Sequence, residues 1–383
     1  MNAVYLDNCA TTALDDEAFE AMLPFLRADY GNASSVHGFG QKARAAVEDS
    51  RSQVAELIGA EPSEIVFSSG GTEADNMALR GTVRSTGEPA HIVTSEIEHP
   101  AVLRCCEALE TEGHRVTYLG VDRAGVIPSM ALDAALTDQT CLVSIQHANN
   151  ETGVIQPIGE MVQLAHERGA LFHTDAVQTV GKIPVDVGSL GVDLLSLSGH
   201  KTHGPKGVGA LYVRRGVELV PLLVGGSQER KRRAGTENVP AVAGLGAACR
   251  QAGARMEETT GRIRTLRDRL EQQIVGTIAG ARINGGVDRR LPHVSNISFG
   301  GLDGEALLVA LDFELIAVST GAACASGSIA PSHVLTAMGL SPERVQGGLR
   351  FSLSRYTTES EIDRVLDVLP GLVRRMTEST GVR

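Results

Sequence analysis

Short runs of apolar and β-branched residues alternate with longer stretches of helical periodicity between about residue 60 and residue 215. Seven of these runs predict β-strands, and they stand at 64–68, 91–95, 115–119, 141–146, 170–175, 193–197 and 207–213. Several are continuously apolar, as is typical of strands that helices cover on both faces. The helical stretches between them predict a mostly parallel, doubly wound α/β sheet, which binds ligands beyond the carboxyl ends of its strands.

The pattern changes near residue 240. Apolar positions recur at helical spacing over 240–278, among many charges, and predict a long amphipathic helix with a solvated face. Three shorter strands are predicted beyond it, mixed with helices, near 294–299, 315–319 and 349–353. We therefore expect a second, smaller α+β domain in this part of the chain.

The chain of 383 residues is long enough for two buried cores. We expect residues 15–255 to form a large domain around the seven-stranded sheet. Residues 1–14 and 256–383 are expected to form the small domain. Neither an internal repeat nor a low-complexity linker separates the two parts, so the pattern places the boundary near residue 255 only approximately.

Composition narrows the classes of function. The net charge of −11 argues against direct nucleic-acid binding and against binding to a membrane surface. The chain has no tryptophan and few other aromatic residues, which argues against recognition by stacked aromatic platforms. The N-terminus has no basic region followed by an apolar stretch, so secretion and membrane insertion are poorly supported. The six cysteines form no C-x-x-C pair, which argues against a metal site or a disulfide framework and predicts a reducing cytoplasm.

A lysine directly follows the strand predicted at 193–197. Gly199 permits a turn after Ser198, and Lys201 then stands where a strand end can face a cleft. Desolvation in such a cleft lowers the pKa of an amine and makes it nucleophilic. Taken alone, a lysine at such a position is far more often a solvated surface residue. Lys206 is a rival, but its GPKG segment lacks the Ser or Thr that a Walker phosphate loop requires.

Two polar residues follow the strand predicted at 170–175. An acid at the strand end, Asp175, can pair with a protonated pyridine nitrogen and so strengthen an electron-sink cofactor. Gln178 follows three residues later and is predicted on the incoming helix, where it can reach a ring hydroxyl. The alternative for Asp175 is an ordinary N-cap.

A phosphate site is predicted from the segment SSGGTEADN. Gly71 lies at a strand-to-helix turn, where backbone N–H groups can approach an anion, and Thr72 adds a hydroxyl. Ser198 and His200 arrive beside the lysine and can donate further. Alternatively, Thr72 is only a helix cap, with Glu73 in the first turn satisfying the helix dipole.

Two more residues fit the same cleft. His99 precedes a proline that can start a helix, so its ring can project from a strand-to-helix corner, stack on a planar cofactor and exchange protons. Asn150 can donate to a cofactor ring oxygen or to a substrate carboxylate. Taken alone, His and Asn residues at such turns are more often structural.

Ten segments, taken together, resemble the cysteine desulfurases of the NifS and IscS type, which have the class V aminotransferase-like fold. These segments occur in the same order as in the family, from residue 5 to about residue 355. Their joint occurrence is specific, whereas any single segment is not. The segments are YLDNCATT, YGNASSVHGFGQKAR, FSSGGTEADN, EIEHPAVL, HANNETGVIQPI, DAVQTVGK, SLSGHKTHGPKGVGALYV, RRAGTENV, STGAACASGS and LRFSLSR. The fold implied is that of the type I transferases dependent on pyridoxal 5'-phosphate, a large domain with a mostly parallel seven-stranded sheet and a smaller α+β domain.

The resemblance implies pyridoxal 5'-phosphate as the cofactor. Lys201 would bind it covalently, Asp175 would pair with its pyridine nitrogen, and His99 would stack on its ring. The remaining contacts implied are to the ring oxygen and the phosphate, from Gln178, Asn150, Gly71, Thr72, Ser198 and His200. Thr236 of RRAGTENV would reach the phosphate from a neighbouring subunit, which implies a homodimer.

The resemblance also implies the substrate, L-cysteine, and its contacts. Arg350 would clamp the substrate carboxylate, for which a planar bidentate fork is well suited, and Asn32 and Ala33 would lie close to the substrate. Cys324 lies in a run of small residues, expected to be a mobile loop of the small domain, and would take the sulfur as a persulfide while L-alanine leaves. His99 is the candidate that moves the proton of the substrate thiol.

Three positions depart from the family pattern. Cys9 stands where the family usually has alanine, which places an extra thiol near the dimer or the substrate channel; we expect it to be structural. Gly199 and His203 stand where alanine and tyrosine are frequent, so the geometry of this loop can differ. Neither Gly199 nor His203 removes a catalytic group.

The sulfur acceptor is left open by the sequence. Candidates are an iron–sulfur scaffold and an enzyme that puts sulfur into tRNA or DNA, and the short segment after residue 376 puts the scaffold in doubt. Alternative activities are those of a selenocysteine lyase or of another class V lyase or aminotransferase that needs no active-site thiol. A non-catalytic sulfur-carrier adaptor with the same fold is a further alternative.

Overall fold

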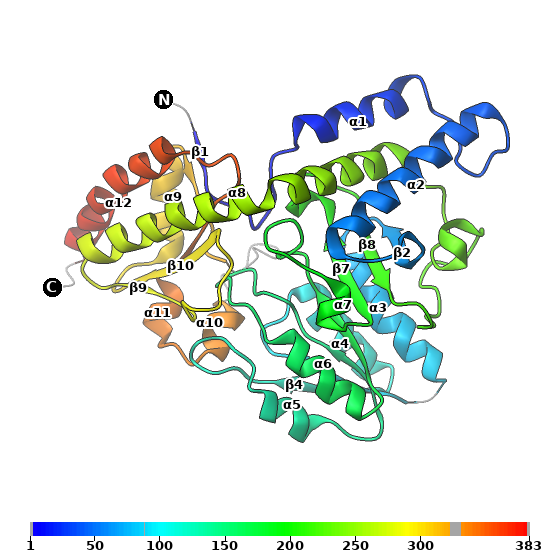
Figure 1. Cartoon of the computed structure of the whole chain (residues 1–383). Coiled ribbons are helices and arrows are strands. Elements are labelled where there is room, and N and C mark those ends of the chain that lie inside the picture. The colour runs from blue at the N-terminus through cyan, green and yellow to red at the C-terminus, as the bar shows by residue number, and fades with distance from the viewer. Residues whose placement is uncertain (1–2, 88, 322–330, 381–383) are drawn as a thin grey trace.

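Seven strands form one mostly parallel sheet in the computed structural model, which describes residues 3–87, 89–321 and 331–380 (Figure 1). The order across the sheet is β2-β8-β7-β6-β5-β3-β4, and β8 runs antiparallel to both of its neighbours. The strands are β2 (Ile65–Ser68), β3 (His91–Ser95), β4 (Arg115–Leu119), β5 (Thr140–Ser144), β6 (Leu171–Asp175), β7 (Leu194–Ser198) and β8 (Gly209–Val213). All seven predicted strands are confirmed, with ends displaced by at most two residues.

Helices cover both faces of this sheet, which explains its continuously apolar strands. One face packs against α3 (Gly71–Thr86) and α4 (Pro100–Thr111). The opposite face packs against α2 (Gly38–Ile58), α5 (Ser129–Ala135), α6 (Ile158–Glu167) and the beginning of α8 (Val239–Thr277). Helix α1 (Asp16–Arg27) lies along α8, and the short α7 (Val187–Leu190) leads into β7.

A second sheet has its own apolar core. Its antiparallel strands have the order β12-β10-β9, and a separate parallel pair joins β1 to β11. The strands are β1 (Val4–Tyr5), β9 (Ala281–Ile283), β10 (Val294–Phe299), β11 (Ile316–Ala317) and β12 (Gly348–Ser352). The helices are α9 (Gly304–Phe313), α10 (His333–Ala337), α11 (Pro342–Gln346) and α12 (Glu359–Thr380).

Helix α8 connects the two cores. Leu245, near its beginning, lies in the core of the large sheet, whereas Leu266 and Leu270 lie in the core of the small sheet. The helix begins after Asn238, whose side-chain oxygen accepts the N–H of Ala241, as an N-cap does. The predicted helix over 240–278 is confirmed (Figure 1). The predicted division of the chain at residue 255 falls inside this helix and stays a prediction.

Two strands lie outside the predicted set. Strand β1 has two residues and pairs with β11, with Val4 opposite Ile316, a partner that no local pattern indicates. Strand β9 is three residues long and pairs with the end of β10. In the described part of the chain, no helix is long and apolar enough to cross a membrane.

Candidate active site

The site lies at the carboxyl ends of β6 and β7, which pair in parallel so that Asp175 stands opposite Ser196. Beyond β7 the chain enters a 3-10 turn over Gly199–Lys201. A Cβ atom on Gly199 would lie 2.9 Å from the carbonyl oxygen of Pro205, so the tight turn needs glycine there. The turn places Lys201 beside the end of β6, as predicted for a lysine that faces a cleft.

The amine of Lys201 is held by backbone carbonyl groups. Its Nζ donates to the carbonyl oxygens of Cys9 and Ala10 at 2.6 and 2.7 Å. Burial lowers the pKa of Lys201, and the nearby Arg350 guanidinium lowers it further. An amine with a lowered pKa is a better nucleophile at neutral pH, which is the chemistry expected of a residue that attacks a carbonyl cofactor.

The carboxyl group of Asp175 is buried at the end of β6. It accepts the N–H of Val177 at 2.9 Å. Burial raises the pKa of Asp175, while the His99 ring and the Lys201 amine act in the opposite direction. These electrostatic interactions place Asp175, His99 and Lys201 in one cluster. A buried carboxylate of this kind favours a cationic partner.

The helix predicted after Asp175 is not formed, so the prediction for Gln178 is wrong in this respect. Residues 177–182 make consecutive turns instead, because Gly181 adopts a φ of +76° and redirects the chain. Gln178 nevertheless points toward the cluster. Its Nε2 donates to the Cys9 carbonyl oxygen at 3.1 Å, the same atom that Lys201 contacts. Among the described residues its Oε1 has no partner.

His99 occupies the predicted corner between β3 and α4. Its Nδ1 accepts the N–H of Ala101 at 3.1 Å, so the neutral ring carries its proton on Nε2. Burial lowers the pKa of His99, and Lys201 and His333 lower it further, against the effect of Asp175. A neutral imidazole with a fixed Nε2–H is suited to stack on an aromatic ring and to exchange a proton.

The first turn of α3 forms a cradle for an anion. Ala74 is the first residue whose N–H bonds back, to the carbonyl of Gly70, so the earlier N–H groups of the helix are available to a ligand. A Cβ on Gly71 would lie 2.8 Å from Val177 and 3.5 Å from the Cβ of Ser198, which shows how closely the helix start approaches both strand ends. Thr72 follows in the same turn.

Glu73 and His200 lie next to this cradle. The Glu73 carboxylate is paired with Arg233 at 2.8 Å and accepts the N–H of Ser69. His200 lies next to Lys201, with its Nδ1 3.2 Å from the Thr11 hydroxyl. The cradle, the buried acid and the amine together fit a cofactor that carries a phosphate, a basic ring nitrogen and a carbonyl group.

Arg350 lies on β12 and is buried. Its Nη2 contacts Asp7 at 2.7 Å, and its Nη1 donates to the main-chain oxygen of Asn150 at 3.0 Å. Its charge also affects the pKa of Lys201, so the guanidinium faces the same cluster. Arg350 and Asn150 are therefore brought together with the lysine. The contact of Asn150 seen here is through its backbone, so the predicted role of its side chain stays a prediction.

Three predicted residues are not joined to this cluster by any contact that the described residues show. Asn32 and the buried Ala33 lie in the loop between α1 and α2, where the Asn32 side chain accepts the N–H of Ser34. Thr236 lies exposed on the loop before α8, in a stretch that Arg233 ties to α3. Cys324 lies outside the described residues.

Two departures from the family pattern have clear positions. The Cys9 thiol is buried, with its Sγ 3.7 Å from Nε2 of His293, while its carbonyl borders the cluster. His203 adopts a φ of +62°, and its Nδ1 lies 2.9 Å from the carbonyl oxygen of Ala13. The ring of His203 also stands edge-on to Tyr356.

A buried group of hydrogen-bonded polar side chains near Asp175 was not predicted from the sequence. His173 contacts the hydroxyls of Ser144 and Ser196 at 2.8 and 2.9 Å, and Asp75 of α3 lies 3.7 Å from it. Burial raises the pKa of Asp75, and the charge of Asp175 raises it further. Because side chains alternate between the two faces along the strand LFHTD, His173 lies on the same sheet face as Asp175. This alternation is the sequence signal that could have identified His173.

Comparisons with known proteins agree with this geometry. The family model described as Aminotransferase class-V matches residues 4–365. A protein of Trichormus azollae named cysteine desulfurase is 52% identical over 376 residues, which are 98% of this chain and 94% of that protein.

Solved structures of other proteins share this fold. A NifS-like protein superposes with a TM-score of 0.92 at 38% identity, covering 98% of this chain and 100% of the other. DndA from Streptomyces lividans superposes with a TM-score of 0.77 at 40% identity, covering 92% and 99% of the two chains. The chain belongs to the class V aminotransferase family, in the group of NifS-like cysteine desulfurases.

Proposed function

We propose that the protein is a cysteine desulfurase dependent on pyridoxal 5'-phosphate, which converts L-cysteine to L-alanine and passes the sulfur to Cys324. The observation that carries the proposal is the cluster of Lys201, Asp175 and His99 at the strand ends, next to an anion cradle on α3. Enzymes of this family generally use this cofactor. Its relatives at about half identity act on cysteine, as their name says.

The residues that would hold the cofactor follow from their chemistry. Lys201 would attach it, Asp175 would pair with its ring nitrogen, and Gln178 would meet its ring oxygen. The phosphate would take the free N–H groups of α3 and the side chains of Thr72, Ser198 and His200. When bound, the cofactor supplies an electron sink for the pair left at the substrate Cα.

The remaining steps belong to side chains of this protein. Arg350 orients the substrate through its carboxylate. The free amine of Lys201 donates to the carbonyl oxygens of Cys9 and Ala10 and would move the proton at Cα of the substrate. His99, through Nε2, exchanges the proton of the substrate thiol.

Sulfur transfer requires a thiolate, for which Cys324 is the proposed residue. Its sulfur attacks the sulfur of the bound cysteine, so that an S–S bond forms and the substrate C–S bond breaks. The electron pair of the broken bond stays with the carbon fragment, which is protonated and leaves as L-alanine. The Cys324 persulfide then passes its outer sulfur to an acceptor thiol.

A homodimer is part of this proposal, because Thr236 is expected to reach the phosphate of the partner subunit. Large apolar side chains are exposed on the α1–α2 loop and before α8, among them Val36 at 89% and Val224 at 91%. Exposed apolar groups of this size favour a protein interface. Light scattering of the purified protein tests this, since a monomer that retains full activity would contradict the dimer.

The acceptor is proposed to be a protein of iron–sulfur assembly or of sulfur modification of tRNA or DNA. The similarity to DndA supports the second class as a candidate. We place the protein in a reducing cytoplasm, which the unpaired state of the described cysteines supports. Selenocysteine lyase activity is the alternative, because the same cofactor cluster would serve it.

The activity assay is direct. Purified protein with L-cysteine and a reductant should release L-alanine and sulfide in equal amounts. Lys201→Ala should abolish both products and the cofactor's absorbance. Comparison of L-cysteine with L-selenocysteine separates the two activities: turnover of selenocysteine alone, unaffected by Cys324→Ala, would establish the alternative.

A further inference from the structure

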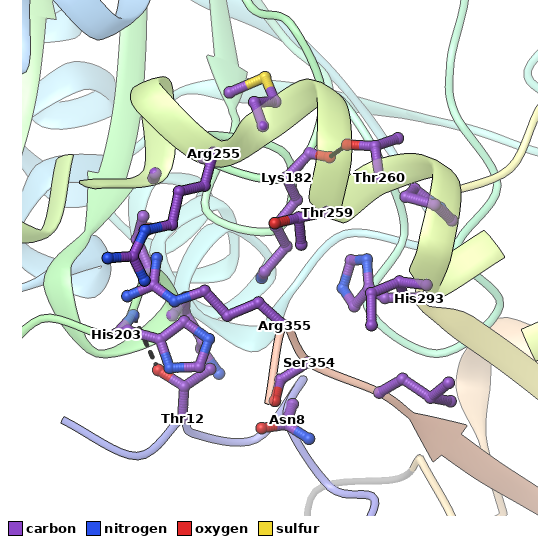
Figure 2. A pocket seen from close by; sticks show the side chains of 18 residues that line it. Asn8, Thr12, Lys182, His203, Arg255, Thr259, Thr260, His293, Ser354 and Arg355 are labelled. Carbon is purple, nitrogen blue, oxygen red and sulfur yellow. Dashed lines mark hydrogen bonds between the residues drawn. The ribbon is translucent and has the colours of Figure 1, made fainter. Parts of the chain in front are cut away.

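A cavity reaches Lys201, which forms part of its lining. It has a free volume of about 50 Å³ and lies between α8, the turn after β6, the beginning of β10 and the segment after β12 (Figure 2). Apart from Lys201, none of the predicted cofactor or substrate residues in the described part of the chain lines it. It therefore shares Lys201 with the cluster described above and otherwise has its own lining.

Three nitrogen atoms on residues that line this cavity have no hydrogen-bond partner among the described residues. They are Nζ of Lys182, Nδ1 of His293 and Nε of Arg355. Figure 2 shows the Lys182 side chain running into the space between His293 and Arg355. Nζ of Lys182 and Nε of Arg355 are donors, and Nδ1 of His293 is a donor in the tautomer that carries its proton there. A buried donor without an acceptor is costly, so these groups around one cavity indicate a missing acceptor.

The charges around the cavity have one sign. Among the described residues that line it, cations and imidazoles occur but neither Asp nor Glu. Arg355 and Arg255 are paired with Asp15 and Glu17 respectively. For Lys182 no carboxylate partner is present in the described part of the chain.

The charge on Lys182 persists in spite of its burial. Its backbone is fixed, because its carbonyl oxygen accepts the hydroxyl of Thr260 on α8 at 3.0 Å. Burial lowers the pKa of Lys182 to about 8, and the charges of Lys201 and Arg350 lower it as well. Most molecules therefore still carry the ammonium charge at neutral pH. A buried, unpaired charge favours an oppositely charged ligand over a neutral one.

We propose that this cavity binds a small inorganic anion between Lys182, His293 and Arg355. The free volume holds roughly three or four water molecules, so a halide or a compact oxyanion fits. Ala252, Met256 and Ile263 form part of the apolar wall of the cavity. The bound anion stabilises the junction of α8 with the two sheets, independently of the proposed sulfur chemistry.

The test is thermal unfolding of the cofactor-loaded enzyme in sodium bromide and in sodium sulfate, each against sodium gluconate at equal ionic strength. The unfolding temperature of the unaltered protein should rise with each tenfold increase in the small anion. Lys182→Met keeps the aliphatic volume and should lose this rise. Arg374→Met, which removes an exposed cation on α12, should retain it.

The comparison between variants removes general salt effects, since sulfate stabilises many proteins by exclusion from their surface. Lys182→Met should also unfold at the same or a higher temperature in gluconate, because it deletes an unpaired buried charge. The response to bromide against sulfate tells a halide site from an oxyanion site. An equal rise in Lys182→Met and in the unaltered protein would overturn the proposal.

Crystals of the loaded enzyme grown in bromide give an independent result. The anomalous signal of bromide should lie in the cavity, within contact of Nζ of Lys182. Its absence from this cavity at a concentration that raises the unfolding temperature would also overturn the proposal. Because the cofactor phosphate fills the α3 cradle in the loaded enzyme, a signal there would not be confused with this site.

Discussion

The amine of Lys201 lies 2.6 Å from the carbonyl oxygen of Cys9, a backbone atom that Gln178 also contacts. The N-terminal segment thus positions the lysine from outside the seven-stranded sheet. The contact provides a fixed place for the amine when it is not bound to a cofactor. Substitution of the Cys9 side chain leaves this carbonyl in place, which is consistent with the family's use of alanine at the same position.

His99 allows its structural and chemical roles to be separated. Its Nδ1 caps α4, so His99→Ala should cost about 1 kcal/mol of the free energy of unfolding. His99→Asn retains a capping oxygen and should unfold like the unaltered protein. Both variants lose the imidazole and should show a drop in kcat of roughly 10²–10⁴. Normal kcat in a stable His99→Asn protein would remove His99 from the proton transfer.

Substitution of Gly71 tests whether the first turn of α3 binds the phosphate of the cofactor. A Cβ atom there would lie 2.8 Å from a methyl group of Val177, so Gly71→Ala forces a shift between α3 and the turn after β6. We expect at least about tenfold weaker retention of the cofactor, since the phosphate donors move apart. Dialysis followed by absorbance measures it.

Gly261→Ala is the matched control, because a Cβ atom there meets nothing within 4 Å. It lies inside α8 and should raise stability by about 0.5–1 kcal/mol through helix propensity alone. Cofactor retention equal in both variants would show that the start of α3 does not hold the phosphate.

Ionisation of Glu98 should lower the stability of the folded protein as the pH rises. Burial raises the pKa of Glu98 to about 8, so the folded protein holds a proton that the unfolded chain releases near pH 4.5. The stability that this proton contributes is complete at acidic pH and is lost as the pH rises toward 8. Glu98→Gln, which cannot ionise, should therefore lose less stability than the unaltered protein between pH 5 and pH 9.

The measurement is the midpoint of urea unfolding as a function of pH. Glu96→Gln serves as the control, because this neighbouring residue is exposed and its substitution should leave the pH profile unchanged. Parallel profiles for the unaltered protein and Glu98→Gln would mean that Glu98 is ionised in the fold.

Local patterns predicted much of this fold. The seven sheet strands are predictable because each is a short apolar run bounded by polar turns, and His99 at its corner follows from the adjacent proline. The prediction of a helix at Gln178 was wrong because the spacing of Asp175 and Gln178 suits a turn equally well. Only tertiary packing around Gly181 decides between them.

Contacts between segments that are distant in the chain could not be predicted from local sequence patterns. The pairing of β1 with β11 and the contact from Cys9 to Lys201 join residues far apart in the chain. The role of Lys182 depends on which residues surround it, and its sequence context suggests only a turn lysine. Assignment of Cys324 as the nucleophile still depends on the resemblance.

The most direct test of Cys324 as the sulfur acceptor is therefore a single turnover of the loaded enzyme with one equivalent of L-cysteine and no reductant, followed by peptide mass spectrometry. The peptide containing Cys324 should gain the mass of one sulfur atom, one equivalent of L-alanine should appear, and Cys324→Ala should yield neither. Sulfur found on Cys9 instead, or alanine formed by Cys324→Ala at the normal rate, would contradict this assignment.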